Sequence, residues 1–236
     1  KAIGRAGAGT NNIPVADMSK RGVPVFNAPG ANANAVKELV IAAMLMAARN
    51  LIPAQHFVQG LAGDDKTLHK LVEDGKKQFV GTELPQQTLG VVGLGKIGSL
   101  VADAAIKLGM NVVGYDPHIT VDAAWSLPAQ VRKANSIEEV LKGSDYVTLH
   151  VPLIDATRNM MDAARIALLK EGAILLNFAR DGLVDDAAVV EALNAKRLRY
   201  YVCDFPAEKF AGHPQVIALP HLGASTREAD DNCAVM

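Results

Sequence analysis

Residues 88–116, TLGVVGLGKIGSLVADAAIKLGMNVVGYD, are the stretch that decides the fold. Residues 89–92 form a short apolar run typical of a buried strand, and a glycine turn, residues 93–98, follows it directly. Apolar residues then recur at the spacing of one helix face, and Gly109 is placed to end that helix. A second apolar run, residues 111–115, leads into Asp116. Strand, glycine turn, helix, strand and acid in this order match a dinucleotide-binding βαβ unit.

Each glycine of the turn has a physical task in such a unit. Gly93 permits the tight turn, Gly95 removes a side chain that would block a pyrophosphate, and Gly98 lets helix and strand approach closely. Free N–H groups at the helix N-terminus then receive the pyrophosphate. Asp116 accepts hydrogen bonds from the adenosine ribose hydroxyls, whereas its charge repels a 2′-phosphate. The pattern therefore predicts NAD rather than NADP; the alternative is a purely structural glycine turn.

The composition excludes several other classes of protein. The chain has 236 residues, enough for one large or two small domains with a sizeable core, and its net charge is −1 with no basic run that would suit a nucleic acid. Its longest apolar run, residues 39–48, is too short to span a bilayer. Cys203 and Cys233 form no motif, which favours a cytoplasmic protein with reduced thiols. No metal site is predicted.

Strands and helices alternate along the rest of the chain. The apolar runs predict a parallel sheet covered on both faces, an α/β, Rossmann-like doubly wound fold. Expected strands are residues 23–27, 146–151, 173–178, 200–204 and 216–219; expected helices are residues 14–20, 35–50, 67–73, 136–141, 163–169 and 185–195.

The predicted helix over residues 35–50 is apolar almost all round. A helix without a polar face must be buried on every side, between domains or against a second subunit. Pro53 marks its end or a kink. We therefore expect a homodimer built on the domain that contains this helix.

Three ionisable residues stand near predicted strand ends, where ligands of open α/β sheets bind. Arg180 can hold a carboxylate through two parallel hydrogen bonds, which orients a 2-hydroxy or 2-keto acid. His221 can take a hydroxyl proton near neutral pH, and Glu208 can orient its imidazole. Spacing alone leaves the alternatives open: a surface arginine, a loop histidine and an exposed loop charge.

Six motifs in order carry a family resemblance: GRAG (4–7), GLGKIG (93–98), YDP (115–117), LHVPL (149–153), NFARDGLVD (177–185) and PHLGAST (220–226). Together they resemble the D-2-hydroxyacid dehydrogenase family over essentially the whole chain, and most of all its members that oxidise a phosphorylated 2-hydroxy acid with NAD. The resemblance implies an NAD-binding Rossmann domain over residues 34–222. Residues 1–33 would be the end of a flavodoxin-like substrate domain, and residues 223–236 the start of the helix that returns to it. With most of that domain outside the chain, we expect NAD binding with little turnover.

The same resemblance implies the roles of single residues. His221 would be the acid/base, Glu208 its partner, Arg180 the binder of the substrate carboxylate, and Asp204 the partner of the nicotinamide carboxamide. The implied cofactor-binding residues are Gly93, Gly95, Lys96, Ile97, Gly98, Asp116, His150, Val151, Pro152, Thr157, Phe178, Ala179, Arg180, Asp204, His221 and Gly223. The implied substrate-binding residues are Arg5, Ala6, Gly7, Asn27 and Arg180, with Arg5 a candidate phosphate contact.

Two departures from the family pattern bear on function. The usual spacing D-V-F-x-x-E is one residue shorter here, as residues 204–208 read DFPAE, which puts the pairing of Glu208 in question. Asp181 stands where glycine is common. Two alternatives stay open: another D-2-hydroxyacid dehydrogenase, acting on glycerate, glyoxylate, lactate or a similar acid, and an NADH-sensing corepressor-like binding protein with little turnover.

Overall fold

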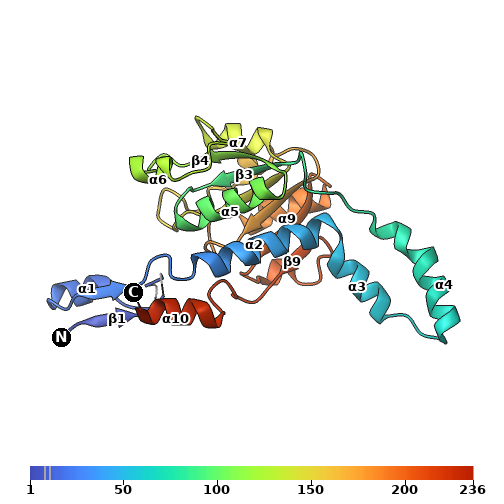
Figure 1. Cartoon of the computed structure of the whole chain (residues 1–236), viewed down its shortest axis with the longest axis horizontal. Coiled ribbons are helices and arrows are strands. Elements are labelled where there is room, and N and C mark those ends of the chain that lie inside the picture. The colour runs from blue at the N-terminus through green and yellow to red at the C-terminus, as the bar shows by residue number, and fades with distance from the viewer. Residues whose placement is uncertain (8, 11, 236) are drawn as a thin grey trace.

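One parallel sheet forms the centre of the molecule (Figure 1). The computed structural model describes residues 1–7, 9–10 and 12–235. Seven strands lie in the order β5-β4-β3-β6-β7-β8-β9, so the order reverses between β3 and β6. They are β3 (Thr88–Val92), β4 (Asn111–Tyr115), β5 (Val131–Lys133), β6 (Tyr146–Leu149), β7 (Ala173–Asn177), β8 (Leu198–Cys203) and β9 (Val216–Ala218). The predicted doubly wound α/β class is confirmed.

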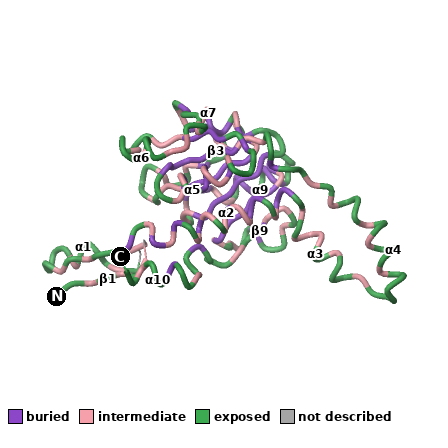
Figure 2. Tube along the Cα trace, in the orientation of Figure 1, coloured by how far each residue is buried: buried purple, intermediate pink, exposed green. Residues whose placement is uncertain are grey.

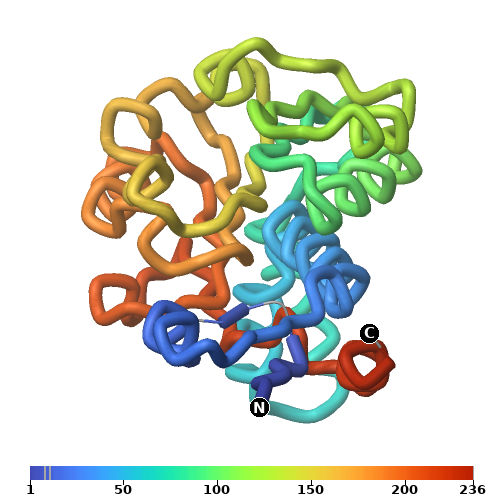
Figure 3. The backbone as a smooth tube through the Cα atoms, turned by 90° about the vertical axis from the view of Figure 1, so that its left-hand side faces the viewer, coloured from blue at the N-terminus to red at the C-terminus, as the bar shows by residue number. Residues whose placement is uncertain are grey.

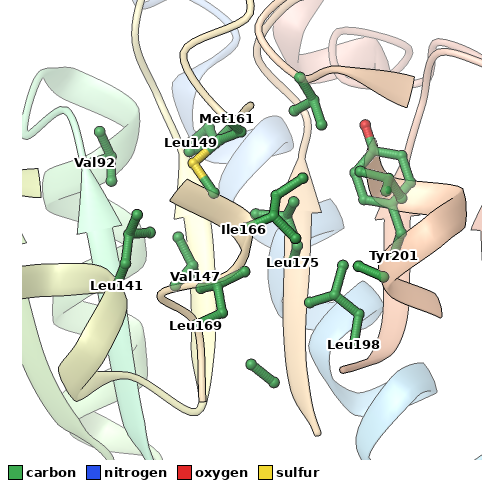
Figure 4. Close-up of a cluster of buried hydrophobic side chains, with 14 of the residues drawn as sticks. Val92, Leu141, Val147, Leu149, Met161, Ile166, Leu169, Leu175, Leu198 and Tyr201 are labelled. Carbon is green, nitrogen blue, oxygen red and sulfur yellow. The ribbon is translucent and has the colours of Figure 1, made fainter. Parts of the chain in front are cut away.

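Helices cover both faces of this sheet and bury a hydrophobic cluster on each. Helices α2 (Ala33–Ala48) and α5 (Lys96–Lys107) cover one face, and α7 (Ile137–Gly143), α8 (Ala163–Ile166) and α9 (Asp186–Asn194) the other. On β7, Leu175 belongs to one cluster and its neighbour Ile174 to the other. Figure 4 shows Ile166 beside Leu175, and Leu141 beside Val147 in the same cluster. Successive side chains on opposite faces, both buried, explain the continuous apolar runs.

A helical arm projects from the body (Figure 1). It consists of α3 (Leu51–Gln59), α4 (Asp65–Gly75) and the 3-10 turn η1 (Lys76–Phe79). Neither α3 nor α4 has a buried residue, and Figure 2 shows the arm exposed or half-buried along its length. The helix expected near residues 67–73 is α4, but α3 was not expected. Asn50 adopts a left-handed conformation (φ 51°) between α2 and α3, and Pro53 lies in the first turn of α3, where its missing N–H costs nothing.

The two ends of the chain meet in a small separate unit. Strands β1 (Ile3–Arg5) and β2 (Val25–Asn27) pair in parallel, with α1 (Val15–Lys20) between them in sequence. Helix α10 (Arg227–Val235) lies beside this unit, and both termini are on the same side of the molecule (Figure 3). The Asn232 side chain donates a hydrogen bond to the Ala31 carbonyl at 3.2 Å. The first and last segments therefore pack as one region.

The structure differs from the sequence-based expectation in two further places. Helix α2 buries one face only: its inner side packs in the core, whereas Leu45 on its outer side is 38% exposed. The single chain thus leaves the outer face of α2 uncovered, and its burial between domains or against a second subunit stays a prediction. The connection after Asp116 contains α6 (Val121–Trp125) and the edge strand β5, neither of which was expected. None of the described helices is long and apolar enough to cross a membrane.

Candidate active site

The glycine turn lies at the point where the strand order reverses, between the ends of β3 and β6. Gly93 has a φ of +91°, and a side chain there would collide with the His150 carbonyl. A side chain on Gly98 would collide with the carbonyl oxygen of Gly93. Both positions therefore require glycine, as the sequence predicted for the turn and for the close approach of helix and strand.

Gly95 differs from its neighbours because the space in front of it is open. A Cβ added there would meet no atom within 4 Å, and no side chain caps α5, which begins at Lys96. Lys96 is exposed, with Nζ 3.4 Å from the Pro29 carbonyl, and Ile97 is half-buried. Uncapped N–H groups facing open space at a helix N-terminus fit the pyrophosphate of a dinucleotide.

Two backbone N–H groups hold the carboxylate of Asp116. Leu94 N–H donates to Oδ2 and His118 N–H to Oδ1, both at 2.9 Å. The carboxylate is thereby tied to the glycine turn and fixed in direction. It borders a pocket of about 550 Å³, within the range of small-molecule sites.

The walls of this pocket include residues that sequence reasoning missed. Ile119, Leu127 and Ala134 line it together with Leu94 and Tyr115. The first three come from the connection between β4 and α7, for which no element was expected. The apolar residues of that segment were the available signal.

The end of β6 supplies the other side of the reversal point. The His150 N–H donates to the Val92 carbonyl at 2.7 Å, and Val151 lies against Gly93. The Thr157 hydroxyl donates to the Pro152 carbonyl at 2.6 Å and accepts the Ile154 N–H at 2.9 Å, which closes the turn that follows. His150 and Val151 thus lie beside the glycine turn, and Pro152 and Thr157 belong to the turn that follows them.

The imidazole of His150 is held neutral. Nε2 lies 3.0 Å from the Thr148 hydroxyl, and Nδ1 is buried without a hydrogen-bond partner among the described residues. Burial disfavours the charged ring and lowers the pKa of His150 to about 4.

This shift predicts an acid-sensitive fold. Between about pH 6.5 and 4 the unfolded chain binds a proton at His150 that the folded chain does not, so stability falls as pH falls through that window. The expected loss is on the order of 3 kcal/mol. Urea unfolding at several pH values measures it. His150→Gln should flatten the slope, whereas His69→Gln on the exposed arm should leave it in place; equal slopes in all three proteins would contradict the assignment.

The turn after β7 presents Arg180. Asn177, buried at the end of the strand, accepts the Ala179 N–H at 3.2 Å and donates to the Arg180 carbonyl at 3.0 Å. A Cβ added to Gly9 would lie 3.2 Å from Arg180 Nη2, so the guanidinium faces the small unit. Phe178 is buried, as is usual for a strand end under such a turn. Sequence reasoning named Phe178, Ala179 and Arg180 but missed Asn177, whose role shows only in its hydrogen bonds.

Asp204 follows β8 and is 1% exposed, and neither of its oxygens has a hydrogen-bond partner in the described part of the chain. Burial raises the pKa of this carboxyl, while the charges of His221 and Arg180 act in the opposite direction. Gly223 is buried, and a Cβ there would lie 3.7 Å from Asp204 Oδ2.

His221 follows β9 and is exposed, with its ring centroid 5.0 Å from that of Phe205. Glu208 is also exposed, in the 3-10 turn η2 (Glu208–Phe210). Among the described residues no hydrogen bond or ion pair joins Glu208 to His221. The structure thus brings His221 together with Asp204 and Phe205.

The small unit places Arg5 at the end of β1. Its Nη1 donates to the Ala6 carbonyl, and its Nε is buried without a partner in the part of the chain that the structure describes. Gly7 has a φ of +136°, and its carbonyl accepts the Ala28 N–H at 3.0 Å. Asn27 lies opposite Arg5 in the strand pair. The described residues contain no group of three His, Cys, Asp or Glu side chains that could hold a metal ion.

Comparison with known proteins gives matches over most of the chain. Residues 41–223 match the family described as D-isomer specific 2-hydroxyacid dehydrogenase, NAD binding domain. The D-3-phosphoglycerate dehydrogenase of Methanocaldococcus jannaschii is 41% identical, and the match covers 97% of this chain and 42% of that protein. The D-3-phosphoglycerate dehydrogenase of Bacillus subtilis is 38% identical, and the match covers 99% of this chain and 43% of that protein. The chain therefore spans about two fifths of the length of these relatives.

Solved structures show the same fold. The structure of D-2-hydroxyisocaproate dehydrogenase superposes with a TM-score of 0.85 at 27% identity, over 100% of this chain and 73% of that one. The structure of the D-lactate dehydrogenase of Aquifex aeolicus, complexed with NAD and lactic acid, superposes with a TM-score of 0.81 at 26% identity. The match covers 99% of this chain and 72% of that one.

Proposed function

The chain belongs to the family of D-isomer specific 2-hydroxyacid dehydrogenases, and from this premise we propose that it carries the NAD site of an enzyme that oxidises D-3-phosphoglycerate to 3-phosphohydroxypyruvate, the first step of L-serine biosynthesis. The relatives named for this reaction support the substrate. We also propose a cytoplasmic location, in keeping with the two free cysteines.

One observation carries the proposal: residues from five strand ends meet at one edge of a parallel sheet. The glycine turn and Asp116 follow β3 and β4, and Arg180, Asp204 and His221 follow β7, β8 and β9. Parallel strands present their carboxyl ends at the same edge, where ligands of this fold bind. The glycine turn and Asp116, which would bind the dinucleotide, thus lie at the same edge of the sheet as the residues that would act on a substrate.

The chemistry follows from the side chains. Arg180 holds the substrate carboxylate through two parallel hydrogen bonds, which fixes C2 and its hydroxyl. The imidazole of His221 takes the hydroxyl proton as C2 loses hydride and the C2–O bond becomes a carbonyl. NAD, when bound, accepts that hydride. The carboxylate of Asp204 is suited to accept a hydrogen bond from the nicotinamide carboxamide.

Arg5 supports a phosphorylated substrate. Its guanidinium lies in the small unit, and the buried Nε has no partner among the described residues. A buried arginine nitrogen is costly unless an anion satisfies it. A phosphate at the end of the substrate remote from C2 would supply that anion.

A substrate panel tests the proposal. Purified full-length protein is incubated with NAD and D-3-phosphoglycerate, D-glycerate or D-lactate, and NADH formation is followed. We expect the highest kcat/KM with D-3-phosphoglycerate, and a fall of about tenfold or more for that substrate alone in Arg5→Gln. A higher kcat/KM with an unphosphorylated acid would make the protein a different 2-hydroxyacid dehydrogenase. Tight NADH binding without turnover on any acid would favour a sensor.

We also propose the division at residues 33 and 222, with a homodimer formed through the NAD-binding domain. The outer face of α2 and the arm support the dimer. Val58 on α3 is 53% exposed and Val80 after η1 is 76% exposed, so the arm presents apolar side chains that a single chain leaves in water.

Light scattering measures this association. We expect a mass twice that of one chain, and a monomer in Val58→Asp because a charge would be buried at the interface. Val121→Asp, on the exposed α6 away from the arm, should stay dimeric. A monomeric unaltered protein would contradict the dimer.

A further inference from the structure

The two ends of the arm meet at one point of the body. The Thr82 N–H, just beyond η1, donates to the Ala48 carbonyl at the end of α2 at 2.9 Å. A side chain on Gly81 would collide with the same carbonyl, so the two backbone segments approach each other more closely than a larger residue would allow. Neither α3 nor α4 has a buried residue that could anchor the arm farther out. The direction of the arm is therefore set at this root.

Asn50 links the two ends of the arm through its side chain. It lies between α2 and α3 in a left-handed conformation (φ 51°), which asparagine adopts more readily than most residues. Its Nδ2 donates to the Val80 carbonyl at 3.0 Å and lies 3.4 Å from the Phe79 carbonyl. Its Oδ1 accepts the Tyr200 hydroxyl at 3.1 Å and Arg199 Nη2 at 3.2 Å. One amide thus joins the returning end of the arm to strand β8.

An irregularity in β8 directs Arg199 to this junction. The pairing with β7 steps from Leu198 to Tyr200, so Arg199 is an extra residue in the ladder. An extra residue of this kind changes the direction of its side chain. Nη2 of Arg199 also lies 3.4 Å from the Ala48 carbonyl, and Nη1 lies 3.5 Å from the Thr82 hydroxyl. The guanidinium therefore faces both ends of the arm.

The helices of the arm are packed on each other, which makes the arm one piece. A side chain on Gly75, at the end of α4, would collide with the ring of Phe57 on α3. The ring centroid of Phe57 is 5.3 Å from that of Phe79 in η1, a favourable separation for an aromatic pair. At the root, Ile52 in the first turn of α3 packs against the core. A change at the root should therefore turn the whole arm instead of bending it in the middle.

We propose that Asn50, supported by Arg199 and Tyr200, fixes the direction of the arm in the single chain, so that the arm is preformed to meet a second copy. A preformed arm loses little conformational freedom when two chains associate, which lowers the cost of binding. The effect on association rests on the proposed homodimer, whereas the junction lies within one chain. The three residues are positioning residues, because they act through the arm.

Asn50→Gly removes the junction with little disturbance of the backbone. Glycine adopts positive φ freely, so the connection between α2 and α3 keeps its path while every hydrogen bond of the amide is lost. Asn50→Asp removes only the donor: the carboxylate still accepts from Arg199 but cannot donate to the Val80 carbonyl. Lys196→Gly is the matched control. Lys196 also has a positive φ (58°) and is exposed, and its side chain takes part in none of the bonds described above.

Single-molecule energy transfer measures the direction of the arm within one chain. Dyes are attached to Lys70→Cys on α4 and Lys142→Cys on α7, both of which are exposed positions. The labelled chain also carries Val58→Asp and is measured at picomolar concentration, so that no second copy holds the arm. Cys233→Ser removes the half-buried thiol, and the remaining cysteine is buried.

The width of the distance distribution is the result that decides the role of the junction. We expect one narrow distribution in the labelled parent and in Lys196→Gly. Asn50→Gly should give a broader or displaced distribution, and Asn50→Asp an intermediate one. A distribution in Asn50→Gly equal to that of the parent, or equal broadening in Lys196→Gly, would overturn the role of Asn50.

Sedimentation equilibrium of chains with an unaltered Val58 measures the effect on association. We expect Asn50→Gly to raise the dimer dissociation constant about tenfold or more, because the arm must then be ordered on binding. Lys196→Gly should leave the constant unchanged. An unchanged constant in Asn50→Gly would overturn the preformed arm. A monomeric unaltered protein would refute the homodimer and the effect on association, and this failure is distinct because energy transfer tests the junction in single chains.

Discussion

Gly98→Ala is expected to remove NAD binding and to destabilise the fold at once. The added methyl group would collide with the carbonyl oxygen of Gly93, within a turn that both β3 and α5 hold in place. Backbone cannot move aside as a flexible side chain can, so the turn or the helix must shift. Forced overpacking of this kind costs about 1–3 kcal/mol or more. Urea unfolding measures the stability, and calorimetric titration measures NAD affinity.

Gly95→Ala is the matched control because it separates binding from folding. A methyl group at Gly95 meets no protein atom within 4 Å, so the unfolding free energy should stay within about 0.5 kcal/mol of the original. The same group occupies the space assigned to the pyrophosphate, and NAD affinity should fall sharply. Unaltered affinity in Gly95→Ala would mean that the dinucleotide does not cross this turn.

His221→Ala is expected to cause the largest loss of activity. Removing a general base lowers the rate by about 10²–10⁴-fold. Since the proton transfer occurs only in the transition state, kcat and kcat/KM should fall together. Steady-state rates of NADH formation by the full-length protein with D-3-phosphoglycerate measure both.

An exposed histidine far from the sheet edge provides the comparison. His69 lies on α4 in the arm, and His69→Ala should keep the original rates. If His221→Ala lowered the rate less than tenfold, another group would have to take the hydroxyl proton. The arrangement of Arg180 and His221 would then need a different interpretation.

The sequence predicted the sheet well because its two signals, the apolar runs and the glycine turn with Asp116, each lie within a short stretch of the chain. Apolar runs such as residues 173–178 identified strands that are buried on both faces, and the glycine turn with Asp116 located the crossover between two of them. Strand ends then indicated Arg180, Asp204 and His221 at one edge. These inferences need only the alternation of elements and the rule that parallel strands end together.

What the sequence could not predict depends on contacts between distant segments. The pocket beside Asp116 is lined by Ile119 and Leu127 from the connection that contains α6, whose apolar residues follow no regular period. Asn177 gave no signal in the pattern, because its function is to hold the turn that carries Arg180. The pairing of Glu208 with His221 comes from the family resemblance and stays a prediction.

The most direct test of the account is calorimetric titration of the 236-residue chain with NAD and with NADP. Asp116 is fixed by two backbone N–H groups, so its negative charge stays where a 2′-phosphate would lie. We expect NAD to bind at least about tenfold more tightly than NADP, a difference of about 1.4 kcal/mol, and Asp116→Asn to narrow that gap. Equal or tighter binding of NADP, or no binding of either dinucleotide, would contradict the account.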